Sequence, residues 1–198
     1  MQVKFIAKPT LEAIARKTLF AHNAHYSDGP PSATPLELMA ESIGLSIEYA
    51  CLSSNGNALG KTAFEDGATP IFDKEKQEYV NIETMTGTIF IDESLVKDPA
   101  LHGRYRYTLA HEMAHWILHR NIFANYDETF YETNKKEIEW QADYLAQSLL
   151  MPKGQVQKAF YARIHSISTL PDLAKIFEVS KQAMGIRLET LGLRLYLG

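Results

Sequence analysis

The sequence has 198 residues, a length that suits one domain with a sizeable core. Hydrophobic residues make up 45% of it and charged residues 22%, which excludes the disordered and fibrous classes of protein. The formal net charge of −4 argues against broad binding to nucleic-acid phosphates, because such binding needs a basic surface. The single cysteine, Cys51, excludes an internal disulfide and a metal cluster held by several thiolates.

The sequence also lacks the hydrophobic segments of secreted and membrane proteins. Residues 1–9 do not contain the apolar core of a signal peptide. No uninterrupted apolar run approaches the ~20 residues that a membrane-spanning helix needs. We therefore expect a soluble, cytoplasmic protein that does not associate with a membrane.

The N-terminal part predicts two helices and a strand. The first helix covers residues 10–21 and is capped by its first residue. Two prolines after a glycine interrupt regular secondary structure at 27–32. A second helix starts near Pro35 and stops at Gly44, and the alternating residues 45–49 predict a strand.

The middle of the chain predicts a small mixed or antiparallel sheet. Short β-prone pieces occur at 69–72 and 79–82, and the clearest strand is 87–91, which is rich in β-branched and aromatic residues. If strand 87–91 lies at an edge of the sheet, its backbone could pair with an extended peptide.

The second half of the chain is predicted to be mainly helical. After Asp98 and Pro99 a helix runs through residues 111–115, and a polar and aromatic loop covers 121–134. A strong amphipathic helix follows at 135–150 and ends before a proline.

The tail predicts helices only. Its last two short helices, 170–177 and 181–191, have the spacing of a helix-turn-helix, with Ser180 as the cap of the second. Glu178 lies at the tight turn, where glycine is usual and where a negative charge would face DNA phosphates. Basic and acidic residues balance in this segment, so we expect no binding to duplex DNA.

The chemistry of the sequence centres on an HExxH motif, His111-Glu112-Met113-Ala114-His115. Residues four apart on a helix lie about 40° apart around its axis and about 6 Å along it, so two such imidazoles can bind one zinc ion. Glu112 lies near enough to polarise a water on that metal. The competing interpretation is a pair of partly exposed histidines beside a surface glutamate, because the motif is short.

A catalytic zinc needs a third protein ligand, and Glu139 is the best candidate. It lies beside the apolar stripe of the helix at 135–150, 24 residues after His115. Asp143 follows one turn later, where it could accept a hydrogen bond from a metal-bound imidazole. The competing interpretation is two exposed carboxylates on a charged helix. The other candidates downstream are Glu128, Glu132, Glu137 and His119.

His119 extends the histidine series but does not fit as a third ligand. It lies about 12 Å along the axis from His111, so one straight helix cannot bring both it and the HExxH pair onto one ion. We interpret His119 as a histidine at the helix end or one satisfied within the core, with a supporting role behind a ligand as the alternative. His22, His25, His102 and His165 have no comparable partners in the sequence.

Three blocks resemble the ImmA/IrrE metallopeptidases in their order and spacing: Thr108-Leu109-Ala110-His111-Glu112-Met113-Ala114-His115-Trp116, Glu139-Trp140-Gln141-Ala142-Asp143-Tyr144-Leu145-Ala146 and Leu149-Leu150-Met151-Pro152. The segment 173–180 is similar to the C-terminal helical segment of that family. The likeness covers most of the chain from about Gly87. Ala114 stands where the family often has glycine, which is a small change.

The resemblance implies an α+β, zincin-like fold, with a small sheet and an HExxH active-site helix. It implies Zn²⁺ bound by His111, His115 and Glu139, Glu112 as the catalytic base, and Asp143 as the residue that orients His111. We expect a metallopeptidase domain over residues 1–152 and a helical segment over 153–198 packed on it.

Three functions fit these observations. The first is a zinc endopeptidase whose partner is a protein substrate, a helix-turn-helix repressor or an antitoxin-like regulator, as in the family it resembles. The second is a DNA-binding regulator that uses the helices at 170–191. The third is a non-catalytic or toxin-like partner protein with a structural metal, which would need four protein ligands. For the peptidase, Tyr105, Tyr126, Tyr131 and His165 are candidates to stabilise the oxyanion, although a structural role is favoured for each.

Overall fold

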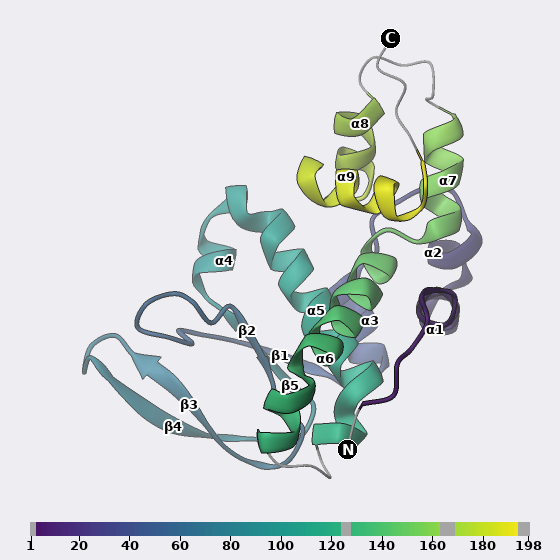
Figure 1. Ribbon diagram of the computed structural model, residues 1–198. Coiled ribbons are helices and arrows are strands. Elements are labelled where there is room, and N and C mark those ends of the chain that lie inside the picture. The colour runs from purple at the N-terminus through teal and green to yellow at the C-terminus, as the bar shows by residue number, and fades with distance from the viewer. Residues whose placement is uncertain (1–2, 124–127, 163–168, 194–198) are drawn as a thin grey trace.

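The computed structural model describes residues 3–123, 128–162 and 169–193, and these form a mixed α+β protein, as the sequence predicts (Figure 1). The elements in chain order are α1 (Lys8–His22), α2 (Ala24–Asp28), α3 (Leu36–Ser42), β1 (Ser46–Ala50), β2 (Gly60–Thr62), β3 (Gly67–Asp73), β4 (Glu78–Thr84), β5 (Thr88–Asp92), α4 (Ser94–Lys97), a 3₁₀ turn η1 (Pro99–Leu101), α5 (His102–Phe123), α6 (Glu128–Leu150), α7 (Lys153–Tyr161), α8 (Thr169–Ile176) and α9 (Lys181–Thr190).

Two long helices, α5 and α6, pack against each other at the centre of the protein, and α1 packs on α6 (Figure 1). The apolar stripe predicted for α6 is fully buried: Ile138, Ala142, Leu145 and Leu149. These positions recur every three or four residues, so they lie on one face of the helix. Burying this face fixes the orientation of α6 about its own axis and thereby determines which of its side chains face α5.

The three-stranded sheet has the order β1-β5-β2, with β1 parallel and β2 antiparallel to β5. Every residue of β5 is buried. The strand predicted at 87–91 is confirmed as β5, but it pairs on both sides, so the condition under which it could pair with an extended peptide is not met. A strand that is buried on both faces and paired on both edges has the continuous apolar and β-branched sequence seen here. Among the described residues, β2 has a strand partner on one side only and so forms an edge of this sheet. Strand β2 was not predicted from the sequence.

The predicted strands at 69–72 and 79–82 are confirmed and are longer than expected. They form the antiparallel hairpin β3–β4, which pairs from Gly67 with Thr84 to Asp73 with Glu78. The hairpin lies on the side of the protein that carries the sheet, away from α7, α8 and α9 (Figure 1).

Several predicted helix boundaries were wrong. The first helix begins at Lys8, and Thr10 lies inside it and does not cap it. The region 121–134 is mostly not a loop, because α5 continues to Phe123 and α6 begins at Glu128. The ring of Phe123 lies 5.4 Å from that of Tyr131, and this contact between the two helix ends supports helix where the local sequence is polar.

The C-terminal helices share the buried core of the protein. Side chains of α8, α9 and the residues beside them belong to the same apolar cluster as those of α5 and α6: Leu173, Phe177, Met184 and Leu188. Ser180 caps α9 as predicted, because its hydroxyl accepts a hydrogen bond from the backbone N–H of Ala183. The division of the chain at residues 152 and 153 stays a prediction.

An ion pair holds α9 against α1. The fully buried Arg187 donates hydrogen bonds to both carboxylate oxygens of Glu12, at 2.7 and 3.1 Å, and to the backbone carbonyl of Met151 at 2.9 Å. All of these partners are acceptors, so the guanidinium is satisfied although it has no contact with solvent.

Among the described residues, the helices are too short or too polar to cross a membrane.

We predict that Arg187→Ala lowers the free energy of unfolding by about 3 kcal/mol, because the Glu12 carboxylate beside the core then loses its charged partner. Urea denaturation followed by circular dichroism measures the change. The control is Lys181→Ala, which removes an exposed cation from the same helix and should change stability by less than about 0.5 kcal/mol. Equal effects of the two substitutions would contradict the role of the ion pair.

Candidate metal centre

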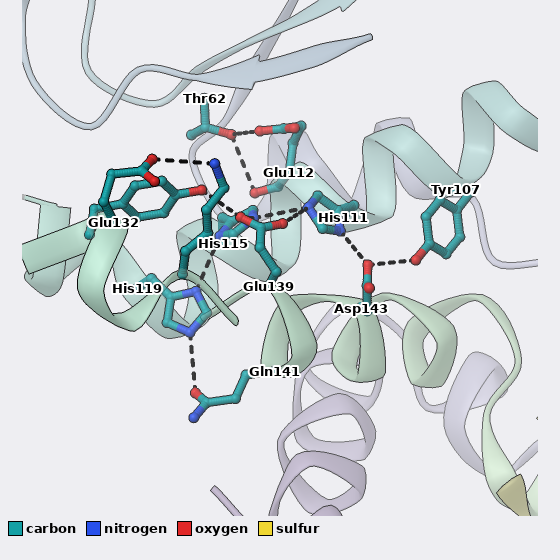
Figure 2. A network of polar contacts seen from close by, with 12 residues as sticks. Thr62, Tyr107, His111, Glu112, His115, His119, Glu132, Glu139, Gln141 and Asp143 are labelled. Atoms are coloured by element: carbon teal, nitrogen blue, oxygen red, sulfur yellow. Dashed lines mark hydrogen bonds and ion pairs between the residues drawn. The ribbon is translucent and has the colours of Figure 1, made fainter. Parts of the chain in front are cut away.

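Helices α5 and α6 bring three predicted ligands to one point. His111 and His115 lie one turn apart on α5, and their Nε2 atoms are 2.9 Å apart. Glu139 of α6 faces them, with one carboxylate oxygen 3.2 Å from Nε2 of His111 and the other 3.6 Å from Nε2 of His115 (Figure 2). One nitrogen or oxygen atom from each of the three residues lies within 4.8 Å of the others, so the group could hold a metal ion.

The electrostatics of this point favour a positive charge. Burial disfavours the charged form of His111, but Asp143 and Glu139 outweigh burial and raise the pKa of His111 to about 10. Contacts with His111 and His115 hold the pKa of Glu139 well below its usual range. Two imidazoles and a carboxylate that stabilise a cation are a donor set that fits zinc, whose catalytic sites use three such ligands.

Asp143 lies against the other side of His111. Its Oδ1 is 2.9 Å from Nδ1 of His111 and accepts a hydrogen bond of 2.6 Å from the hydroxyl of Tyr107 (Figure 2). Burial raises the pKa of Asp143, but these two contacts outweigh it and leave the pKa lowered. A carboxylate in this position turns Nε2 of His111 toward Glu139. Tyr107, which holds the carboxylate, was not predicted from the sequence.

Glu112 is buried between α5 and strand β2. Its Oε2 accepts a hydrogen bond of 2.7 Å from the hydroxyl of Thr62 (Figure 2). Burial raises the pKa of Glu112, and Thr62 and the two histidines oppose that rise. Gly60 lies so close that a Cβ atom there would be 2.7 Å from Oε1 of Glu112. Strand β2 therefore positions the predicted base, and a strand of three residues gives too short a pattern for its detection in the sequence.

His119 is a core histidine, one of the roles considered for it. It is 1% exposed, and its ring lies behind His115, on the side away from Glu139. Burial lowers its pKa to about 4.

The remaining carboxylates considered as third ligands do not join the group. Glu132 is exposed and pairs with Lys135. Glu137 accepts a hydrogen bond from the side chain of Gln141. The side chain of Glu128 lies outside the described residues.

Of the residues considered for stabilising an oxyanion, Tyr131 and Tyr105 are described, and only Tyr131 lies at the centre. Tyr131 lies at the centre, where its hydroxyl donates a hydrogen bond of 2.6 Å to Glu139. Tyr105 instead shares a hydrogen bond with Tyr49 and does not line the cleft. Tyr126 and His165 lie outside the described residues.

The centre opens into a cleft of about 480 Å³ between β2 and the two long helices. Apart from the centre itself, the cleft is lined by residues of β2 and by aromatic side chains: Gly60, Lys61, Thr62, Phe64, Phe123 and Tyr131. The rings of Phe64 and Phe123 stack with their centroids 4.2 Å apart, which forms an apolar wall beside His115.

A comparison with protein families matches residues 62–189 to the IrrE N-terminal-like domain, Peptidase_M78. The chain belongs to the Peptidase_M78 family. The resemblance seen in the sequence is thereby confirmed, and the match begins at Thr62, the last residue of β2, and includes all of α5 and α6, which carry the residues of the centre. The family is one of peptidases. A search of curated proteins gives no match.

We predict that Gly60→Ala destabilises the protein by about 1–3 kcal/mol, because the added methyl group overlaps Glu112 and Thr108. Thermal unfolding measures the effect. Gly67→Ala is the matched control, since Gly67 also lies in a strand and a Cβ there meets open space. A loss of stability in the control as large as that in Gly60→Ala would show that the close approach to Glu112 is not the cause.

Proposed function

We propose that the protein is a zinc-dependent endopeptidase in which His111, His115 and Glu139 bind the metal and Glu112 is the catalytic base. The observation that carries the proposal is the convergence of the two Nε2 atoms and the Glu139 carboxylate on one point, with the Glu112 carboxylate beside it. Membership of a peptidase family supports the reaction class.

A bound zinc ion would polarise the scissile carbonyl and lower the pKa of water to about 7. Glu112 suits the transfer of a proton from a water molecule to the leaving amine, because its carboxylate lines the cleft at the centre and burial raises the pKa of its carboxyl. Thr62 holds one oxygen of Glu112 by a hydrogen bond and thereby fixes the direction of the carboxylate. Tyr131 lines the cleft with its hydroxyl at the metal centre and is our candidate for the group that stabilises the oxyanion.

Strand β2 supplies a place for the substrate backbone. It borders the cleft and pairs on one side with β5, and its other edge has no strand partner among the described residues. An extended peptide can add to such an edge through main-chain hydrogen bonds. Strand β2, and not strand 87–91, is therefore our candidate for pairing with the backbone of an extended peptide. A cleft that binds an extended backbone fits a segment of a protein chain, and the ImmA/IrrE resemblance points to a helix-turn-helix repressor or an antitoxin-like regulator.

The alternatives have less support. A structural metal needs a fourth protein ligand, and the described residues offer three at this point. For DNA binding, Glu178 at the turn between α8 and α9 contacts His102 and Arg106 and adds negative charge to that surface.

We predict one zinc ion per chain in the purified protein, and loss of that zinc in His111→Ala and Glu139→Ala. Metal content is measured by mass spectrometry after gel filtration. Glu132→Ala is the control, because it removes a carboxylate from the same helix at an exposed position. Full zinc content in Glu139→Ala would contradict the assignment of the third ligand.

We also predict that Glu112→Gln keeps the zinc and the fold but cleaves on the order of 10²–10⁴-fold more slowly, because an amide cannot act as the base. New protein N-termini formed in cells that express the wild type or the variant identify substrates and give relative rates. Undiminished cleavage by a zinc-loaded variant would contradict the proposed mechanism.

A further inference from the structure

A buried chain of polar side chains leads from His115 away from the metal centre. Nδ1 of His115 lies 3.2 Å from Nδ1 of His119, and Nε2 of His119 lies 3.2 Å from Oε1 of Gln141 (Figure 2). Both His119 and Gln141 are essentially closed to solvent, at 1% and 0% exposure. Neither residue lines the cleft, so neither can contact a substrate there.

The contacts of Gln141 determine which groups donate and which accept in this series of hydrogen bonds. The side-chain nitrogen of Gln141 lies 3.0 Å from the backbone carbonyl of Lys4 and 2.9 Å from a carboxylate oxygen of Glu137. A carbonyl oxygen can only accept a hydrogen bond, so the NH₂ group of Gln141 must face Lys4. Its oxygen therefore faces His119 and can only accept.

This direction determines the tautomers of both histidines. His119 must carry a hydrogen on Nε2 in order to donate to Gln141. In a neutral imidazole the other nitrogen is then an acceptor, so Nδ1 of His119 presents a lone pair to His115. Nδ1 of His115 must carry a hydrogen in turn, which leaves the lone pair of its Nε2 directed at the point that it shares with Glu139.

We propose that His119 and Gln141 are positioning residues that hold His115 in the tautomer and orientation required to bind a metal through Nε2. The metal-binding part of this inference rests on the proposed function, whereas the tautomers do not. Such supporting hydrogen bonds raise the affinity of a site by fixing the ring of its ligand.

The two histidine ligands are thus held in different ways. His111 faces the carboxylate of Asp143, whereas His115 contacts the neutral side chains of His119 and, through it, Gln141. The amide of Gln141 donates in turn to the backbone carbonyl of Lys4 and to the carboxylate of Glu137. The segment around Lys4 is itself fixed to α6, because the N–H of Val3 donates to Oδ1 of Asn134 at 2.7 Å. Lys4 lies outside residues 62–189, which match the family. The hydrogen bonds that support His115 therefore reach a segment beyond the matched domain.

The tautomers can be measured directly in the metal-free wild-type protein. Long-range ¹H–¹⁵N correlation spectra distinguish protonated from unprotonated ring nitrogens in each imidazole. We expect His119 to carry its hydrogen on Nε2 and His115 to carry one on Nδ1. A hydrogen on Nδ1 of His119 would overturn the proposal, whether or not the protein binds zinc.

Zinc affinity, measured by competition with a chromophoric chelator, tests the consequence. His119→Phe keeps a ring but removes the acceptor, and we expect it to bind zinc about 10- to 100-fold more weakly. His119→Asn restores an acceptor near the position of Nδ1, and we expect it to recover most of the affinity. Wild-type affinity in His119→Phe, or no recovery in a folded His119→Asn, would overturn the proposal.

Two further variants separate positioning from general destabilisation. Gln141→Leu removes the acceptor that fixes the tautomer of His119, and it should weaken zinc binding even if His119→Phe does not fold. Ser148, like Gln141, is a buried residue of α6, and its hydroxyl donates a hydrogen bond to the backbone carbonyl of Tyr144. Ser148→Ala removes this hydrogen bond and should leave zinc affinity unchanged. Equal losses in these two variants would overturn the proposal. Failure of the wild type to bind zinc would instead contradict the proposed function and leave the tautomer measurement as the test of the hydrogen-bond chain.

Discussion

The packing of α6 against α5 is the constraint on which the metal centre depends. The HExxH spacing aligns two imidazoles on α5 by helix geometry alone, but the third donor has to come from another element. The buried apolar stripe of α6 sets the rotation of that helix, so Glu139 and Asp143 on its flank both face His111. Any change that rotates or shifts α6 would therefore move two of the groups around His111 at once.

The charges that this packing gathers are balanced locally. Buried charges are costly unless they are paired, and here the imidazole of His111 lies between the carboxylates of Glu139 and Asp143, while Glu112 accepts a hydrogen bond from the hydroxyl of Thr62. The same rule applies at the other end of the protein, where Arg187 is closed to solvent and bonded to Glu12. Polar groups in the interior of this protein thus hold elements together that are distant in sequence.

The sequence predicted the α+β class and most of the helices, because these depend on local periodicity, and it predicted the pairing of His111 and His115 from their spacing on one helix. It favoured Glu139 as the third member because that residue lies beside the apolar stripe of a second helix. It did not predict β2, which is three residues long and pairs through its backbone with β5. Gly60 and Thr62 were therefore missed, since their importance comes from contact with Glu112, about fifty residues away. The partners of His119 were missed for the same reason, because hydrogen bonds between distant side chains leave no local pattern.

The central claim is that α5 and α6 together present two imidazoles and one carboxylate to a single zinc ion. The most direct test is a crystal structure of the zinc-loaded protein with anomalous diffraction recorded at the zinc absorption edge. The account predicts one strong anomalous peak at about 2.0–2.2 Å from Nε2 of His111, Nε2 of His115 and a carboxylate oxygen of Glu139. A peak bound by other residues, or a zinc ion that is not coordinated by Glu139, would contradict it.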